Sequence, residues 1–369
     1  MRRPSNRRLL LVDLGEVTGG VEVYLRRLAQ ILSPSIELYC ICLSKQTAAD
    51  LREEGVRVTL LPRLGRGTRV LGFLAAAFVI PYLVLAHQID SVQVNGFLEA
   101  VFLLQARLLG RKAIYTRHGP FEDDLYHWFR QPRWYLPRFV ARCCARAASV
   151  LICVSTGTQE TLDPRLLPKS TVIPHWVTPA ETHVPPASSL KTPVRVLCVS
   201  RLEEYKGIQF VMDAIRSLPE VELWIVGDGG YRAALERRAA GLNVRFFGFQ
   251  TDPSPYLRAA DIFVMPSLGP EGSSIAALEA MAHGLPCILS DLVVNVELSG
   301  SGQATLHFRR GDAADLKEKL ELVLRDPLCR IHYANAAYER VQRVFSPDRA
   351  ERAYCEILGY RHTGREAMA

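Results

Sequence analysis

The sequence lacks the short motifs that identify many metal-dependent, serine-dependent and nicotinamide-dependent enzymes. Its nine cysteines include no C-x-x-C pair, and no H-x-x-H, H-E-x-x-H or D-x-D arrangement is present, so the pattern predicts no metal site. No G-x-S-x-G motif marks a serine nucleophile. The glycines after the first apolar run do not fit the G-x-G-x-x-G fingerprint, which argues against a nicotinamide dehydrogenase.

Arginine-rich runs and basic segments interleaved with aromatic residues are also absent, so we expect no nucleic-acid partner. The 45 Lys and Arg nevertheless outnumber the 38 Asp and Glu, for a formal net charge of +7. This excess favours anionic partners such as nucleotides or phospholipids, although a generally basic surface would also account for it. The composition, 49% apolar and 22% charged, is that of a globular protein with room for two domains.

A secretory signal is not indicated either, because the apolar part of MRRPSNRRLLLVDLG is short and soon followed by charge. Most cysteines lie in apolar, strand-like runs where a thiol acts as a small hydrophobe, which predicts that the protein resides in the reducing cytoplasm. One long uncharged run, Val70–Ala86, contains Pro81 and is flanked by Arg66 and Arg69. We interpret this run as a buried helix or as a helix that dips into an anionic membrane surface, rather than as a membrane span.

Apolar runs of strand length alternate with helical patterns along the chain, which predicts parallel sheets covered by helices in two doubly wound α/β domains. The expected strands are LLLVDL, IELYCICL, SVQVNG, KAIYTRH, SVLICVS and TVIPHW, then VRVLCVSRL, VELWIVGDG, VRFFGF, DIFVMPS and CILSD. Between the two series, the prolines and small polar residues of Thr178–Pro193 predict an interdomain linker. Helices are expected over Ile208–Ser217, over Tyr231–Ala240 and through the tail from Asp312.

Two glutamates lie eight positions apart in the stretch GPEGSSIAALEAMAHGLP, which reads as a loop and a helix capped by Ser273 or Ser274. Glu271 would lie in the loop at a strand's carboxyl end, where it can accept hydrogen bonds from ligand hydroxyls. The free backbone N–H groups and the helix dipole at the same place favour an anion. Glu279 would lie inside an apolar helix, where a ribose hydroxyl pair could satisfy it. Alternatively, Glu271 is a solvated loop residue and Glu279 pairs with a nearby arginine.

Two cations follow the first strand of the second domain in VSRLEEYKGIQF. Converging on the start of a helix, they could clamp a diphosphate, Arg201 through its planar fork and Lys206 as a point charge. The alternative is a pair of ordinary surface cations beside Glu203 and Glu204.

Glycines and a histidine mark other strand ends. Gly19 and Gly20 open a helix after the first strand, and paired glycines allow a backbone to come close to a ligand. Gly227 lies at a strand end in VGDGG, and His118 lies at another in YTRHGP. His118 could bind a sugar hydroxyl or simply cap a core strand.

Taken together, these stretches resemble the retaining glycosyltransferases of family four, which have the GT-B fold. The resemblance covers nearly the whole chain and is most specific over Val196–Asp291, where SRLEEYKG, IVGDG, FFGF, AADIFVMPS, EGSSIAALEAMAHGLP and SD follow the family's order. It implies two Rossmann-like domains facing a cleft: an acceptor-side domain at 1–178 and a nucleotide-sugar domain at 194–345, joined by a linker at 179–193. The last helix, within 346–369, would pack back on the first domain.

By this resemblance, Glu271 and Glu279 match the family's E-x7-E pair, in which the first acid meets the donor sugar and the second the nucleotide ribose. Glu271 and His118 would be the catalytic residues. The other implied donor-binding residues are Arg201, Lys206, Gly272, Ser273, Ser274, Gly227, Gly19 and Gly20. The diphosphate charge would be neutralised without a metal or other cofactor, and the sugar would be transferred with retention of configuration.

The chain also departs from the family, with QVNG where the family commonly reads HAHG and IPHWV where it commonly reads IPNGV. Both departures fall on the acceptor side. We expect a retaining hexosyltransferase that moves a sugar from a nucleotide-diphosphate donor to a glycan or lipid-linked acceptor, in polysaccharide or glycolipid assembly such as that of lipopolysaccharide. It would act in the cytoplasm at the inner face of the cell membrane. The alternative is a catalytically degenerate sugar-nucleotide-binding subunit that supports a partner transferase.

Overall fold

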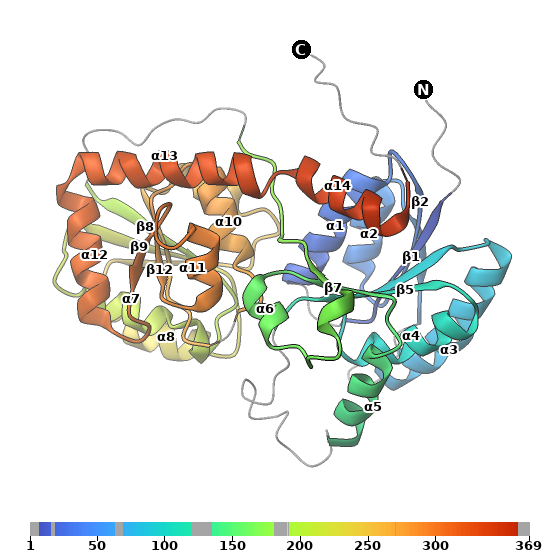
Figure 1. Cartoon of the computed structure of the whole chain (residues 1–369). Helices are drawn as coiled ribbons and strands as arrows, with labels where there is room; N and C mark the ends of the chain where they lie inside the picture. Colours follow the sequence, from blue (N-terminus) through green and yellow to red (C-terminus); the bar gives the residue numbers. More distant parts are fainter. Residues whose placement is uncertain are drawn as a thin grey trace. The chain divides into compact units, whose positions relative to one another are not determined.

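The chain forms two compact units: Met1–His175 together with Pro347–Ala369, and Trp176–Ser346. The computed structural model describes residues 7–15, 19–62, 69–119, 135–180, 190, 192–269 and 271–360. In Figure 1 the first unit takes the blue-to-green part of the chain, and the red end returns to it as α14 (Pro347–Leu358). The first unit is therefore built from two separate stretches of sequence.

The first unit contains a seven-stranded parallel sheet in the order β3-β2-β1-β4-β5-β6-β7. Its strands are β1 (Arg8–Asp13), β2 (Glu37–Cys42), β3 (Arg57–Leu60), β4 (Ser91–Val94), β5 (Lys112–Arg117), β6 (Val150–Cys153) and β7 (Ser170–Val172). The strand order reverses between β1 and β4. In doubly wound sheets, ligands bind beyond the carboxyl ends of the strands at such a reversal.

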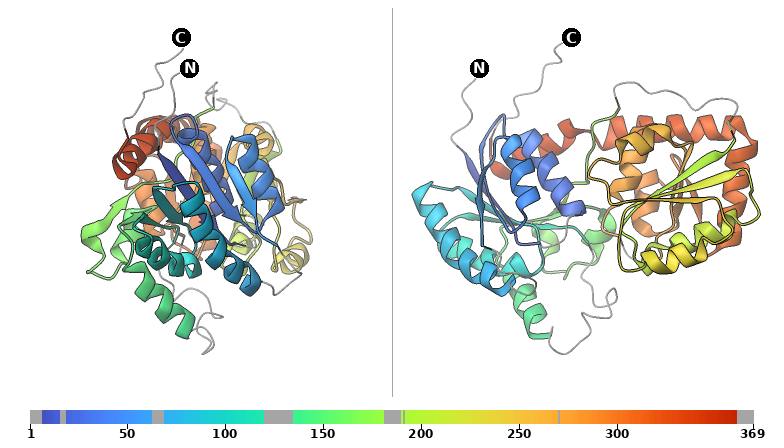
Figure 2. Two further views of the ribbon diagram at one scale, coloured as in Figure 1. Left: turned by 90° about the vertical axis from the view of Figure 1, so that its right-hand side faces the viewer. Right: turned by 180° about the vertical axis from the view of Figure 1, so that it is seen from behind.

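Helices pack on both faces of this sheet (Figure 2). They are α1 (Gly20–Leu32), α2 (Lys45–Glu53), α3 (Arg69–Ala86), α4 (Val101–Leu108), α5 (Tyr135–Ala145), α6 (Thr156–Glu160) and α14, with short 3-10 turns at Leu98–Ala100 and Leu167–Lys169. Leu10 and Val12 of β1 share one core with α3 and α4. Because strand side chains alternate between faces, Gln93 and Thr116 lie on the other face, where they contact Tyr24 of α1.

The second unit contains a six-stranded parallel sheet in the order β10-β9-β8-β11-β12-β13. The strands are β8 (Val194–Val199), β9 (Val221–Val226), β10 (Val244–Gly248), β11 (Ile262–Met265), β12 (Cys287–Ser290) and β13 (Leu306–Phe308). The helices are α7 (Ile208–Ile215), α8 (Arg232–Arg238), α9 (Ser254–Ala259), α10 (Ile275–Ala282), α11 (Val293–Ser299), α12 (Ala313–Arg325) and α13 (Pro327–Val344). A core with α10 and α13 covers one face of the sheet, and a core with α7 and α12 covers the other.

These sheets confirm the predicted strands, and two further strands, β3 and β13, were not predicted. Both lie at the edge of a sheet. Each is short, and the side chains of β3 are all at least partly exposed, so neither shows the buried apolar run used to identify the others. Most of the predicted linker, residues 181–189 and 191, lies outside the described residues.

The apolar run Val70–Ala86 forms α3, as a helix with Pro81 inside it. Its inward side chains are buried, whereas Phe78 is 78% exposed and Tyr82 is 67% exposed. The helix is therefore neither fully buried nor fully exposed. Among the helices that the structure describes, none is long and apolar enough to cross a membrane.

Candidate functional site

Lys206 and Glu271 form an ion pair at the carboxyl end of the second unit's sheet. The Lys206 Nζ contacts Glu271 Oε1, and each side chain is only 12% exposed. Ser267 adds a hydrogen bond from its Oγ to the same carboxylate oxygen, at 2.7 Å. Glu271 is thus not a freely solvated loop residue, and Lys206 is not an ordinary surface cation. The structure places an ammonium group beside a carboxylate in a largely enclosed position.

A chain of buried polar groups fixes the loop that carries Glu271. Ser290 Oγ donates to the Ser267 carbonyl at 2.7 Å, and Asn295 Nδ2 donates to the Ser290 carbonyl at 3.0 Å. Ser274 Oγ then donates to Asn295 Oδ1 at 2.6 Å. All four side chains are at most 3% exposed. These contacts tie β12 and α11 to both ends of the loop, and the only sequence signal for them is small polar residues inside apolar runs.

Ser274 occupies the N-cap position of α10, as predicted, but its hydroxyl makes no capping hydrogen bond. It bonds to Asn295 Oδ1 instead. Ser273 is partly exposed and Gly272 is buried beside it. The start of α10 therefore presents backbone N–H groups and a helix dipole, an arrangement that favours an anion.

Glu279 lies on the partly exposed side of α10, together with Ile275, Ala276 and His283. The opposite side of the helix, which includes Leu278, is buried. The expectation that Glu279 is a buried residue of an apolar helix is therefore wrong. The helix buries only the face that packs on the sheet and α13. At this position the Glu279 side chain is partly exposed.

Tyr205 lies between the two predicted diphosphate-binding cations. Arg201 is exposed and donates from Nη2 to the Tyr205 hydroxyl at 2.8 Å. The Lys206 ammonium lies 5.2 Å from the centroid of the same ring. Tyr205 was not among the predicted site residues, because its role depends on a loop conformation that spacing does not reveal.

Close backbone approaches hold the loops after β8, β9 and β11 together. Gly207 has φ of 73°, and a Cβ there would lie 2.0 Å from the Pro266 carbonyl oxygen. Gly227 has φ of 134°, and a Cβ there would lie 1.8 Å from the Ser200 carbonyl oxygen. Both positions require glycine. Gly227, which was predicted at a strand end, is thus needed for the close packing of its loop against Ser200.

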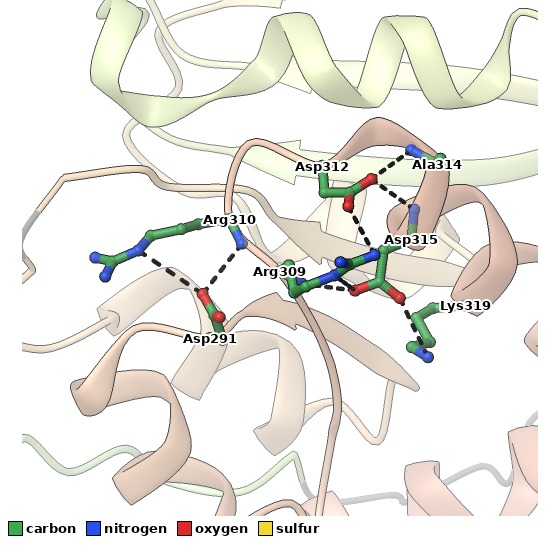
Figure 3. Close-up of polar contacts among 7 residues, drawn as sticks. All are labelled: Asp291, Arg309, Arg310, Asp312, Ala314, Asp315 and Lys319. Carbon is green, nitrogen blue, oxygen red and sulfur yellow. Dashed lines mark hydrogen bonds and ion pairs between the residues drawn. The ribbon is translucent and has the colours of Figure 1, made fainter.

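A network of charged side chains joins the ends of β12 and β13 to the start of α12 (Figure 3). Arg309 pairs with Asp312 at 2.9 Å and with Asp315 at 3.4 Å. The backbone N–H of Arg310 donates to Asp291 Oδ1 at 3.1 Å. Exposed pairs of this kind each contribute less than about 1 kcal/mol, so their main effect is to fix the loop.

In the first unit, Gly19 and Gly20 begin α1, as predicted from the sequence. The Gly19 N–H donates to Glu22 Oε2 at 2.6 Å, so it is already paired within the helix. Residues 16–18 of the predicted glycine loop lie outside the described residues.

His118 follows β5 and is partly exposed, but its Nε2 atom is buried without a hydrogen-bond partner among the described residues. Burial lowers the pKa of His118 to about 3, so the ring is neutral near pH 7. A neutral imidazole has one donor and one acceptor nitrogen, which suits a hydroxyl ligand.

Two family descriptions match the chain in successive segments. Residues 18–181 match "Glycosyltransferase Family 4", and residues 193–326 match "Glycosyl transferases group 1". The chain belongs to the family-four glycosyltransferases. In this family-four protein, Lys206, Glu271 and Glu279 all lie within the second matched segment. The predicted membership of the family-four glycosyltransferases is therefore confirmed.

Relatives of this family-four glycosyltransferase include enzymes of glycan assembly. It is 33% identical over 168 residues to the lipopolysaccharide core biosynthesis glycosyltransferase LpsE of Rhizobium meliloti (strain 1021), covering 44% of this chain and 49% of that protein. It is 26% identical over 312 residues to the UDP-Gal:alpha-D-GlcNAc-diphosphoundecaprenol alpha-1,3-galactosyltransferase of Escherichia coli, covering 76% of this chain and 78% of that protein. The chain thus spans about half the length of the first of these relatives.

Among solved structures, Anabaena HepE in complex with UDP is similar to this family-four chain, with a TM-score of 0.79. The identity is 20%, over 96% of this chain and 99% of that chain. This likeness confirms the predicted α/β fold with two doubly wound sheets, the GT-B fold.

Proposed function

We propose that this protein is a retaining glycosyltransferase that moves a sugar from a nucleotide-diphosphate donor to a hydroxyl acceptor in polysaccharide or glycolipid assembly. The observation that carries the proposal is the enclosed contact between Lys206 and Glu271. A cation beside a hydrogen-bond acceptor matches the order of groups in a nucleotide sugar, in which an anionic diphosphate adjoins a polyol.

In this proposal, Lys206 and Arg201 bind the diphosphate, with the start of α10 as a further source of N–H donors. Glu271 accepts hydrogen bonds from the transferring sugar, and Glu279 accepts them from the ribose. Charge that develops on the leaving diphosphate is then stabilised by groups already held in place, so little reorganisation is needed during transfer. Two similar proteins suggest a UDP-sugar as the donor. The galactosyltransferase named above uses UDP-Gal, and HepE has a solved structure in complex with UDP-glucose.

We further propose that transfer needs no divalent metal, because cations and helix N–H groups meet the diphosphate charge. Among the described residues, no group of three or more His, Cys, Asp or Glu is placed to hold a metal ion. Activity that disappears in excess chelator and returns with magnesium or manganese would contradict this part of the proposal.

The test of the function is a panel of UDP-glucose, UDP-galactose and GDP-mannose. Binding of the true donor should raise the melting temperature of the native state. Transfer to lipid-linked and soluble glycans is then followed, and the anomeric configuration of the product is read by NMR. A product of inverted configuration would contradict retention. Donor binding without turnover against any acceptor would favour a degenerate binding subunit instead.

For the acceptor side, we propose that the first unit contacts an anionic membrane surface. Helix α4 packs against both α3 and α5, and all three carry exposed apolar side chains. We call this set the apolar face: Leu71, Leu74, Phe78, Tyr82, Leu85, Leu104, Leu108, Phe139 and Val140, which are 38% to 79% exposed. Apolar side chains on neighbouring helices can insert at the boundary between lipid headgroups and acyl chains.

Charge on the same three helices supports a membrane as the partner. Helices α3, α4 and α5 contain no Asp or Glu, but they contain Arg69, Arg107, Arg138 and Arg142. Each basic residue near an anionic bilayer adds about 1 kcal/mol of attraction. The full chain should therefore float with phosphatidylglycerol-containing liposomes at low salt and less so at high salt. No association at low salt would contradict membrane contact without affecting the proposed transfer.

A further inference from the structure

His118 and His175 form a stacked pair of imidazole rings in the first unit. The ring centroids are 5.5 Å apart and the ring planes are inclined by 16°. His118 follows β5 directly, and His175 lies three residues beyond β7, so two separate strand ends bring the rings together. Tyr24 of α1 packs edge-on against both rings, with centroid distances of 4.6 Å to His118 and 5.4 Å to His175.

The tyrosine that supports these rings is itself held by hydrogen bonds at its hydroxyl. Gln93 Nε2 donates to the Tyr24 hydroxyl at 2.9 Å, and the Tyr354 hydroxyl contacts it from α14. Gln93 Nε2 also donates to Thr116 Oγ1 at 2.8 Å. Tyr24 is 2% exposed and Tyr354 is fully buried. Residues from β4, β5, α1 and α14 therefore form a buried, hydrogen-bonded base for the imidazole pair.

The two rings differ in access. His118 is partly exposed and has a buried nitrogen without a partner, whereas His175 is only 4% exposed. A buried polar atom that lacks a hydrogen bond costs stability unless a ligand or water satisfies it. His118 is therefore the more accessible of the two rings, and His175 is the more deeply buried one beside it.

Two segments that are far apart in the sequence meet at Tyr24. Gln93 belongs to QVNG at the end of β4, and its amide donates to the hydroxyl of Tyr24. His175 belongs to IPHWV after β7, and its ring packs on the same tyrosine. Tyr24 therefore links the end of β4 to the ring that lies beside His118.

We propose that His175 is a positioning residue that, by stacking on His118 and Tyr24, sets the orientation of His118 toward a hydroxyl group of an uncharged sugar. This inference rests on the proposed function for the identity of the ligand. The hydroxyl belongs either to the donor sugar or to the acceptor sugar. Neither imidazole carries charge near neutral pH, because burial lowers the pKa of both rings.

Two substitutions separate stacking from imidazole chemistry. His175→Phe keeps an aromatic ring on His118, whereas His175→Asn removes the ring. The matched control is His87→Asn. His87 packs on Tyr39 with ring centroids 5.0 Å apart and ring planes inclined by 33°, in the same unit but at the amino-terminal side of β4, away from His118.

The first readout does not depend on any substrate. The ring nitrogen chemical shifts of His118 in protein labelled with ¹⁵N-histidine report its tautomer and surroundings. We expect shifts close to those of the unaltered chain in His175→Phe and His87→Asn, and clearly changed shifts in His175→Asn. Unchanged His118 shifts in a folded His175→Asn variant would overturn the proposal, as would a His175→Phe variant as altered as His175→Asn.

The second readout uses the donor found in the panel of nucleotide sugars. In His175→Asn we expect KM for one sugar substrate to rise about tenfold, with affinity for the free nucleotide diphosphate unchanged. A rise for the donor assigns the hydroxyl to the donor sugar, and a rise for the acceptor assigns it to the acceptor. If neither KM differs between the His175→Asn variant and the unaltered chain, His175 does not position His118 toward a sugar hydroxyl. Failure of the unaltered chain to bind any nucleotide sugar would instead contradict the proposed function, and the NMR result would still stand.

Discussion

At the scale of single residues, the contact between Lys206 and Glu271 is the most informative. Two charges at 12% exposure are tolerable only because each compensates the other and Ser267 adds a hydrogen bond. The same two side chains would have to share their contacts with a donor. The pair therefore contributes to stability and to binding, and substitutions should separate these contributions.

Lys206→Met should lower the free energy of unfolding by about 2 kcal/mol, because it leaves the Glu271 carboxylate largely enclosed without its cation. Adding Glu271→Gln should recover most of that loss. Arg201→Met is the control: Arg201 is exposed, and its loss should change stability by less than about 0.5 kcal/mol. Urea denaturation of the four proteins measures this. Equal destabilisation by Lys206→Met and Arg201→Met would contradict a structural role for the pair.

The two glutamates should respond differently to removal. Glu279→Ala should weaken binding of the donor and of the free nucleotide diphosphate alike, by roughly tenfold to a hundredfold. Glu271→Ala should leave nucleotide affinity nearly unchanged and chiefly lower the rate of transfer, because its contact is to the sugar that moves. Calorimetry and transfer assays on the same preparations measure both effects. An equal loss of nucleotide affinity in the two variants would refute the assigned roles.

The neutral ring of His118 should make the free energy of unfolding depend on pH. Its pKa is lowered to about 3, whereas histidine in an unfolded chain titrates near 6.5. Between these values the unfolded chain binds more protons, so the free energy of unfolding is unaffected above pH 7 and falls as the pH is lowered. The loss at pH 5 should be up to about 2 kcal/mol from this residue. His118→Phe should reduce the difference between urea denaturation at pH 7 and at pH 5, and an unchanged difference would contradict the neutral ring.

At the scale of secondary-structure elements, the sequence predicted what depends on local pattern and missed what depends on neighbours. The alternation of apolar runs was enough for eleven strands, but not for the edge strands β3 and β13. Helix α3 was predicted, but its partial exposure follows from which side packs on the sheet. In the candidate site, Glu271 and Lys206 were found by spacing. Tyr205 and His175 were not predicted as site residues, because their contacts join separate segments of the chain.

Helix α3 supplies a prediction about the apolar face. Phe78→Asp places a charge at a position that is 78% exposed, so it should barely alter folding but should weaken liposome binding at low salt severalfold. Phe249→Asp is the control, since Phe249 is 54% exposed but lies in the second unit. Flotation of the three proteins measures the effect. An equal loss of binding in both variants would show that the apolar face is not the contact surface.

At the scale of the whole molecule, the first unit depends on a helix from the far end of the sequence. Removing residues 347–369 takes away Tyr354, which is fully buried and contacts Tyr24 from 330 positions further along the chain. We expect faster amide hydrogen exchange in α1, β4 and β5, and unchanged exchange in β8 and β9. Tyr354→Phe is a milder version that keeps the ring and should change exchange much less. Faster exchange throughout both units would contradict the expectation that α14 stabilises only the first unit.

The two-part construction of the first unit also has a consequence during synthesis on the ribosome. Residues 176–346, which make the second unit, have all been translated before α14 exists. Most of the second unit is therefore synthesised while the first unit, begun earlier, still lacks its last helix. In that interval Tyr24, Gln93 and Thr116 lack the hydroxyl that Tyr354 later provides. The unit whose synthesis begins first thus receives its last helix after the second unit has been synthesised, and Tyr354 can complete the base under the histidine pair only then.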